Sequence, residues 1–127
     1  MSDLPQNVCK LLSEHIASVG QLELLLMLHG SPGNIWQAAD ASRALYTSEE
    51  TVATQLADLH QHGFVVLESG APGRYRYEPR TADLKQAVAD LEAAYKERRV
   101  AIINFIYSAP VDKVRTFSDA FRFRKGP

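Results

Sequence analysis

Few side chains in this sequence are spaced for catalysis or for binding a metal. The closest histidine pair is His60 and His62, and residues two apart on a helix point in different directions. Cys9 and His29 lie in no spacing that is typical of a zinc site. The adjacent acids Glu49–Glu50 fit the first turn of a helix better than a general acid/base pair. We therefore predict that the protein is not an enzyme and that it binds no metal and no cofactor.

A second set of side chains has the chemistry that contacts nucleic acid. Arginine binds phosphates and guanine, glutamine pairs with adenine, and hydroxyl groups bind phosphates or base edges. The predicted DNA-contacting residues are Arg43, Ser48, Thr51, Thr54, Gln55, Arg74 and Arg76. All of them fall in one stretch, Asn34 to Glu78, so the elements of that stretch decide where they point.

The first half of this stretch has the pattern of two short helices joined by a tight turn. Apolar residues recur at steps of three and four, which gives one helix Ala41, Ala44 and Leu45 and the other Val52, Leu56 and Leu59. Tyr46-Thr47 supplies the turn, and Ser48 is a good N-cap for the second helix. Gly63 fits the left-handed position that ends such a helix.

The second half of the stretch predicts a β-hairpin. Two strand-forming runs, Phe64–Glu68 and Arg74–Glu78, are joined by Ser69–Gly73. In the second run two tyrosines alternate with two arginines, so one face can pack while the other reaches out. The glycine-containing connection precedes a strand, which indicates a hairpin tip and not a phosphate-binding loop. We expect Trp36, just before the first helix, to pack against the hairpin strands, the alternative being a wall of a ligand pocket.

The order of helix, turn, helix and hairpin is that of a winged helix-turn-helix. Residues 41 to 65 carry small, apolar and capping residues in a fixed order, Ala41-Ser42-x-x-Leu45-x-x-Ser48-x-x-Thr51-Val52-x-x-x-Leu56-x-x-Leu59-x-x-x-Gly63-Phe64-Val65. This pattern resembles the core of winged-helix bacterial regulators, most closely the MarR-like group. The resemblance implies a dimeric transcriptional regulator that binds double-stranded DNA.

The distribution of charge favours an alternative function. The net charge of the chain is −1, so any attraction to DNA must come from local patches. The expected recognition helix, Ser48–His62, has three acidic residues and no Lys or Arg, whereas MarR-like recognition helices commonly carry basic residues. The hairpin region, Phe64–Arg80, has three arginines against two glutamates, for a net charge of +1. The alternative function is therefore a winged-helix protein–protein interaction module that has lost specific DNA binding.

Beyond residue 80 the sequence predicts one long helix, Ala82 to Tyr107. Its apolar residues follow a heptad seam that is interrupted by Arg98. A single domain of this size has difficulty covering both sides of such a helix, so we predict a homodimer. The expected contact residues are Leu84, Leu91, Tyr95, Ile102 and Phe105. The alternative cover for the seam is the back of the N-terminal helices.

The last segment, Val111 to Lys125, predicts a short amphipathic helix that packs on the same chain or on its dimer mate. Four apolar residues line one side of it, namely Val111, Val114, Phe117 and Phe121. Basic residues surround this stripe, so a membrane-surface anchor and a partner-binding peptide are the alternatives.

The resulting prediction is a mostly α-helical fold with a small β-hairpin wing. Residues 1–80 are expected to form a winged helix-turn-helix domain with two N-terminal helices, over 6–19 and from 18 or 20 to 29. Residues 81–127 would form the long helix and the tail. A lone cysteine, Cys9, excludes an internal disulfide and fits a reducing compartment. No stretch is long and apolar enough to span a membrane, so we expect a cytoplasmic protein.

Overall fold

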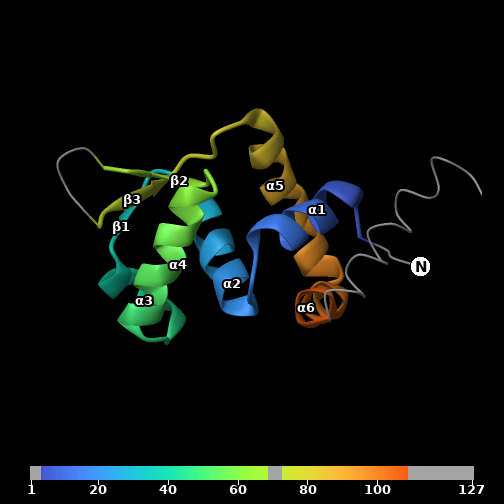
Figure 1. Cartoon of the computed structure of the whole chain (residues 1–127), viewed down its shortest axis with the longest axis horizontal. Coiled ribbons are helices and arrows are strands. Elements are labelled where there is room, and N and C mark those ends of the chain that lie inside the picture. The colour runs from blue at the N-terminus through green and yellow to red at the C-terminus, as the bar shows by residue number, and fades with distance from the viewer. Residues whose placement is uncertain (1–3, 69–72, 109–127) are drawn as a thin grey trace, which may run out of the picture. The chain divides into compact units, whose positions relative to one another are not determined.

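The computed structural model describes residues 4–68 and 73–108, and these form helices and one small antiparallel sheet (Figure 1). The chain divides into two compact units. One consists of residues 20–85, and the other joins residues 4–19 to residues 86–108. This division differs from the one expected at residue 80, because the first helix belongs with the C-terminal helices. None of the helices in the described ranges is, taken singly, long and apolar enough to cross a membrane.

The unit of residues 20–85 contains a helix, a short strand, two more helices and a hairpin. These elements are α2 (Val19–His29), β1 (Ile35–Trp36), α3 (Ala38–Leu45), α4 (Glu49–Gln61), β2 (Val65–Leu67) and β3 (Tyr75–Tyr77). The sheet has the order β1-β3-β2 with β3 in the centre, and Tyr75 pairs with both Trp36 and Leu67. The hairpin is confirmed, with shorter strands than expected. Trp36 meets it as a third strand, which the sequence pattern did not reveal.

The core of this unit comes from α2 and from one face of α4. Helix α2 is apolar almost all round, and Leu22, Leu24, Leu25 and Leu28 are fully buried. The expected inner face of α4 is confirmed, because Val52, Leu56 and Leu59 are fully buried as well. For α3 the expectation was only partly right, since Ala41 is buried but Ala44 is exposed and Leu45 half-buried.

Capping residues and residues with a left-handed backbone mark the ends of these helices. The Ser48 hydroxyl accepts a hydrogen bond from the Thr51 backbone N–H at 3.1 Å, and so caps α4. Gly63, the residue after the C-cap His62, has a φ of +86°, as expected for the left-handed position at the end of α4. Tyr46, which ends α3, has a φ of +56° although it is not glycine. The side chain of Tyr46 is 96% exposed, so no packing against the core requires its identity.

The second unit contains α1 (Gln6–His15), most of α5 (Ala82–Glu97) and α6 (Arg99–Tyr107). Helix α5 begins as expected, with the Thr81 hydroxyl accepting from the Leu84 backbone N–H at 3.1 Å. In this unit α1 packs against α6, and the Asn7 amide donates to the Asp90 carboxylate at 2.7 Å.

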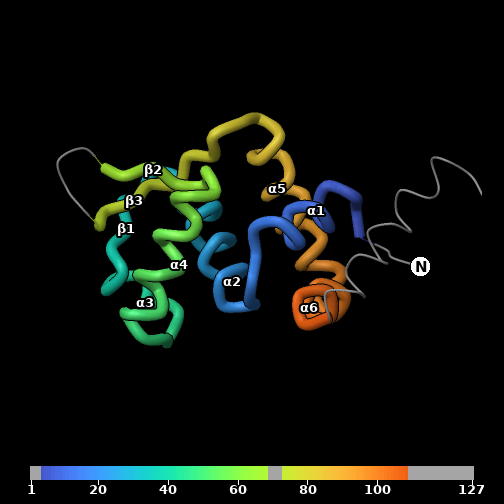
Figure 2. Tube along the Cα trace, in the orientation of Figure 1, coloured from blue at the N-terminus to red at the C-terminus, as the bar shows by residue number. Residues whose placement is uncertain are grey.

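The prediction of one long C-terminal helix was wrong. Helix α5 ends at Glu97 and α6 begins at Arg99, while Arg98 between them has φ −131° and ψ 46°. Figure 2 shows the chain changing direction at this point. No Pro or Gly causes the break. Burying a large apolar side chain is worth roughly 1.5–3 kcal/mol, so three such side chains on α6 outweigh a few lost helix hydrogen bonds of roughly 0.5–1.5 kcal/mol each. The three are Ile102, Phe105 and Ile106.

The break also changes the surface that a dimer could use. Of the residues expected at the dimer contact, Leu91, Ile102 and Phe105 are buried within the single chain, and Leu84 and Tyr95 are half-buried. The burial of Leu91, Ile102 and Phe105 within one chain accounts for their apolar character without a partner. Dimerisation itself stays a prediction. The amphipathic tail of Val111 to Lys125 lies outside the described residues.

Two glycine substitutions, one inside α5 and one at residue 98, test whether the helix is interrupted there. Glycine in a helix interior costs about 1 kcal/mol relative to alanine, so Ala93→Gly, at an exposed position inside α5, should lower the free energy of unfolding by that amount. Arg98→Gly, measured against Arg98→Ala so that the side chain is absent from both, should cost less than half as much, because residue 98 is already outside both helices. Urea unfolding followed by circular dichroism measures both. Equal losses would indicate an uninterrupted helix.

Candidate nucleic-acid interface

Helix α4 contains three of the seven side chains that the sequence predicts to contact DNA, namely Thr51, Thr54 and Gln55. We call its exposed residues the outer face of α4; they are Glu49, Glu50, Thr51, Ala53, Thr54, Ala57, Asp58 and Gln61. This face is opposite to the buried side chains of Val52, Leu56 and Leu59. It contains three carboxylates and no cation, so its charge repels phosphate.

The hydroxyl groups of α4 are engaged in hydrogen bonds within the helix. The Ser48 hydroxyl donates to the Thr51 hydroxyl at 2.7 Å while it caps the helix. The Thr54 hydroxyl donates to the Glu50 carbonyl at 3.3 Å. Gln55 is half-buried, and its side-chain carbonyl oxygen is buried with no hydrogen-bond partner among the described residues. The outer face therefore offers Thr51 and Thr54 to a ligand more readily than Gln55.

Two of the three arginines that the sequence assigns to DNA contact are held by carboxylates. Arg43 lies 2.7 Å from Asp40, on the same side of α3. Arg76 lies 3.5 Å from Glu68 and 3.1 Å from Glu78, and its side chain is only 38% exposed. The hairpin pairing produces this arrangement, because Glu68 follows β2 and Glu78 follows β3 on either side of Arg76. The two glutamates compete with any phosphate for that guanidinium.

Two other arginines of this unit make no ion pair with any described residue. Arg74, just before β3, is exposed. Arg80 is exposed as well and donates to the Gln61 carbonyl at the end of α4, at 3.3 Å. Arg80 is absent from the predicted contact residues. The signal for it in the sequence was its place in the hairpin region, Phe64–Arg80, where it is one of three arginines.

The tyrosines of β3 pack as the alternation with arginine predicts. Tyr77 is buried, with its ring 5.5 Å from that of His29 in an edge-to-face arrangement. The Tyr75 ring lies 5.8 Å from the ring of His60 on α4. These contacts fix the hairpin to the helices, so the position of Arg74 follows from the packing of its neighbour Tyr75.

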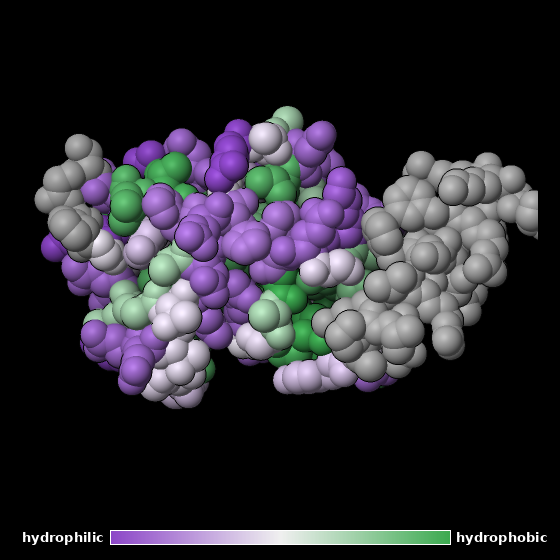
Figure 3. Space-filling view, in the orientation of Figure 1, coloured by the Kyte–Doolittle hydropathy of each residue, from purple (hydrophilic) through white to green (hydrophobic). Residues whose placement is uncertain are grey.

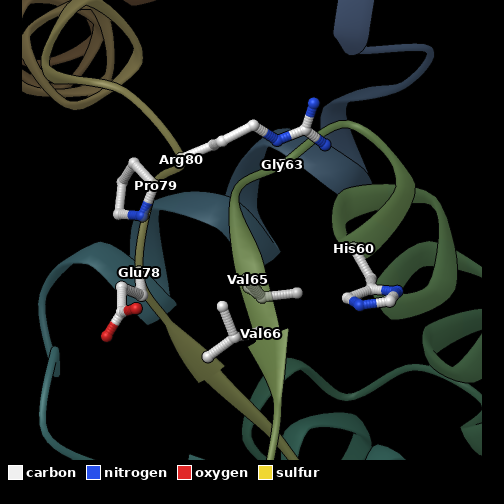
Figure 4. A pocket seen from close by; sticks show the side chains of 7 residues that line it. All are labelled: His60, Gly63, Val65, Val66, Glu78, Pro79 and Arg80. Carbon is white, nitrogen blue, oxygen red and sulfur yellow. The ribbon is translucent and has the colours of Figure 1, made fainter.

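A shallow cavity of about 360 Å³ lies where α4 passes into the hairpin (Figure 4). Figure 4 shows Arg80 extending over Gly63 toward the end of α4, and His60 facing Val65 of β2. The residues that line the cavity are His60, Gly63, Val65, Val66, Glu78, Pro79 and Arg80. Its charged groups have both signs, so the cavity selects neither an anion nor a cation.

Comparisons with protein-family models, with curated proteins and with solved structures found no match. Within the described residues no group of three or more His, Cys, Asp or Glu side chains could hold a metal ion. The case for a function therefore depends on the geometry of α3, α4 and the β2–β3 hairpin.

Proposed function

We propose that residues 20–85 form a winged helix-turn-helix and that the protein is a cytoplasmic, MarR-like transcriptional regulator that binds DNA as a dimer. This proposal rests on one observation, the way in which the neighbouring elements position α4. It follows α3 through the three residues Tyr46–Ser48, buries one face, exposes the other and lies beside a β-hairpin. A helix that is supported in this way can enter a major groove while the hairpin contacts the backbone.

The charges of this unit determine how such a complex would be stabilised. The outer face of α4 has no cation, so Thr51 and Thr54 can contact base edges but cannot neutralise phosphates. The N-terminus of α4, next to Ser48, favours a phosphate through its backbone N–H groups and the helix dipole. Arg74 and Arg80 supply cations that no described carboxylate neutralises. We therefore expect few phosphate contacts and a weak dependence on salt.

The second candidate function is a protein-interaction module of the same fold. It is favoured by the charge of α4, where Glu49, Glu50 and Asp58 are exposed without a cation, and by the two carboxylates that hold Arg76. Such a surface attracts a basic segment of another protein and repels duplex DNA.

Titration with random-sequence duplex DNA at low salt separates the two functions. Each neutralised phosphate contributes a slope of about −0.9 to the dependence of log K on log salt. A regulator with the arginines described above should give a slope of about −2 to −4, measured by fluorescence anisotropy between about 50 and 200 mM salt. Lys10→Ala, at an exposed position of α1 in the other unit, is the control and should leave the slope unchanged. Absence of salt-sensitive binding would reject the regulator and leave the interaction module.

A further inference from the structure

Tyr46, in the connection between α3 and α4, has a backbone conformation that no packing of its side chain explains. Its φ of +56° and ψ of +44° are left-handed, and in the described ranges it is the one non-glycine residue with a positive φ. An L side chain is strained in this conformation, which favours glycine or asparagine at the end of a helix. The side chain is 96% exposed, so contacts within the chain do not offset the strain.

The phenol of Tyr46 is a polar group that is available to a ligand. It makes no hydrogen bond with any described residue, whereas its polar neighbours are engaged. The Ser48 hydroxyl caps α4 and donates to the Thr51 hydroxyl, and Arg43 is held by Asp40 at 2.7 Å. Figure 3 shows pale surface, neither strongly hydrophilic nor strongly hydrophobic, where the α3–α4 connection lies in Figure 1. An uncharged hydrogen-bond donor is therefore exposed at this connection.

We propose that Tyr46 is a further DNA-contacting residue, whose phenol donates a hydrogen bond to a backbone phosphate beside the groove that α4 enters. This contact rests on the proposed function. Tyr46 lies two residues before the N-cap Ser48, near the end of a recognition helix that reaches base edges in helix-turn-helix complexes. Tyrosine is among the side chains that donate to phosphate oxygens. Its rigid ring can pack on the adjacent sugar at a low cost in conformational entropy.

The turn by itself does not require a tyrosine at residue 46. The backbone N–H groups of Tyr46 and Thr47 both donate to the Ser42 carbonyl, which ends α3. Glycine would form the same turn with less strain. A neutral donor also suits the local charge, because an arginine at this position could form ion pairs with Glu49 and Glu50, which are exposed in the first turn of α4. A phenol reaches a phosphate without that competition.

Two substitutions separate the role of the phenol from that of the backbone. Tyr46→Phe removes only the hydroxyl and should weaken binding to random-sequence duplex DNA by roughly two- to tenfold, the range for one hydrogen bond. Tyr46→Gly removes the ring and the strain, so it should weaken binding at least as much while its urea midpoint stays equal to or above that of the wild type. Because tyrosine is neutral, neither variant should change the salt slope, unlike Arg74→Ala. Fluorescence anisotropy and urea unfolding measure these effects.

A matched control and a second readout complete the test. Tyr107→Phe, at a tyrosine of the other unit that is 71% exposed, should bind DNA as the wild type does. Bound duplex should slow the nitration of Tyr46 by tetranitromethane and not that of Tyr107, as measured by peptide mass.

The outcomes distinguish this contact from the proposed function. If the wild type binds duplex and both Tyr46 variants bind equally well, the contact is overturned and the regulator stands. A lower urea midpoint for Tyr46→Gly would make Tyr46 a structural residue and would also overturn the contact. A wild-type chain without salt-sensitive binding rejects the regulator and the contact together, and leaves Tyr46 as an exposed residue of the interaction module.

Discussion

Replacing Gly63 by valine is expected to lower the free energy of unfolding by about 2–4 kcal/mol. The left-handed conformation costs an L-residue roughly 1–2 kcal/mol, and a β-branched side chain more. A Cβ at this position would lie 2.8 Å from Nε of Arg80. The guanidinium must then leave its position over Gly63, which breaks its hydrogen bond to the Gln61 carbonyl. Urea unfolding of both proteins measures the difference.

Substitutions at other glycines separate the two causes of this loss, which are the backbone strain at residue 63 and the contact with the Arg80 side chain. Gly73 has a φ of +80° and nothing within 4 Å of an added Cβ, so Gly73→Ala reports backbone strain alone. Gly33 has open space and no positive φ in the left-handed range, and Gly33→Val should be close to neutral. In an Arg80→Ala background Gly63→Val should cost less than in the wild type, because the contact with the guanidinium is gone. A Gly63→Val variant as stable as Gly33→Val would contradict this account of how α4 ends.

Removing Arg74 together with Arg76 is expected to weaken binding to duplex DNA by roughly tenfold for each phosphate contact that is lost. The loss should be similar for all DNA sequences, because phosphate contacts carry no base information. The two single variants should differ. Arg74 has no carboxylate partner among the described residues, while Glu68 and Glu78 hold Arg76. We expect Arg74→Ala to account for most of the effect, as measured by anisotropy over a range of salt concentrations.

The glutamates around Arg76 give the reciprocal test. Glu68→Gln removes one of the two carboxylates at nearly constant volume and should free the guanidinium for phosphate. Affinity should rise, and the salt slope should steepen by up to about 0.9. Glu92→Gln, in the other unit, is the matched control for the change in net charge. If Arg74→Ala and Glu68→Gln both leave the affinity unchanged, the hairpin is not part of the DNA-binding surface.

Interactions between near neighbours could be predicted from the sequence. The cap at Ser48, the cap at Thr81 and the left-handed Gly63 each depend on one residue type and on backbone groups within about four residues. The inner face of α4 and the inward tyrosines of β3 follow from periodicities of 3.6 and 2. Such features can be predicted because the spacing of apolar residues within one helix or strand indicates which face of that element is buried.

Features that depend on residues far apart in the sequence could be seen only in the tertiary structure. Strand β1 has two residues, too few for any period, and exists because β3 offers it a free edge. The seam of α5 and α6 continues past Arg98 in the sequence, but the chain bends there because burial of Ile102 and Phe105 outweighs a continuous hydrogen-bond ladder. The charge that Arg76 presents depends on the β2–β3 register, which brings Glu68 to it across the hairpin. Sequence determined which residues could cap, pack or carry charge, whereas only the packed chain decided which of those charges face solvent without a partner.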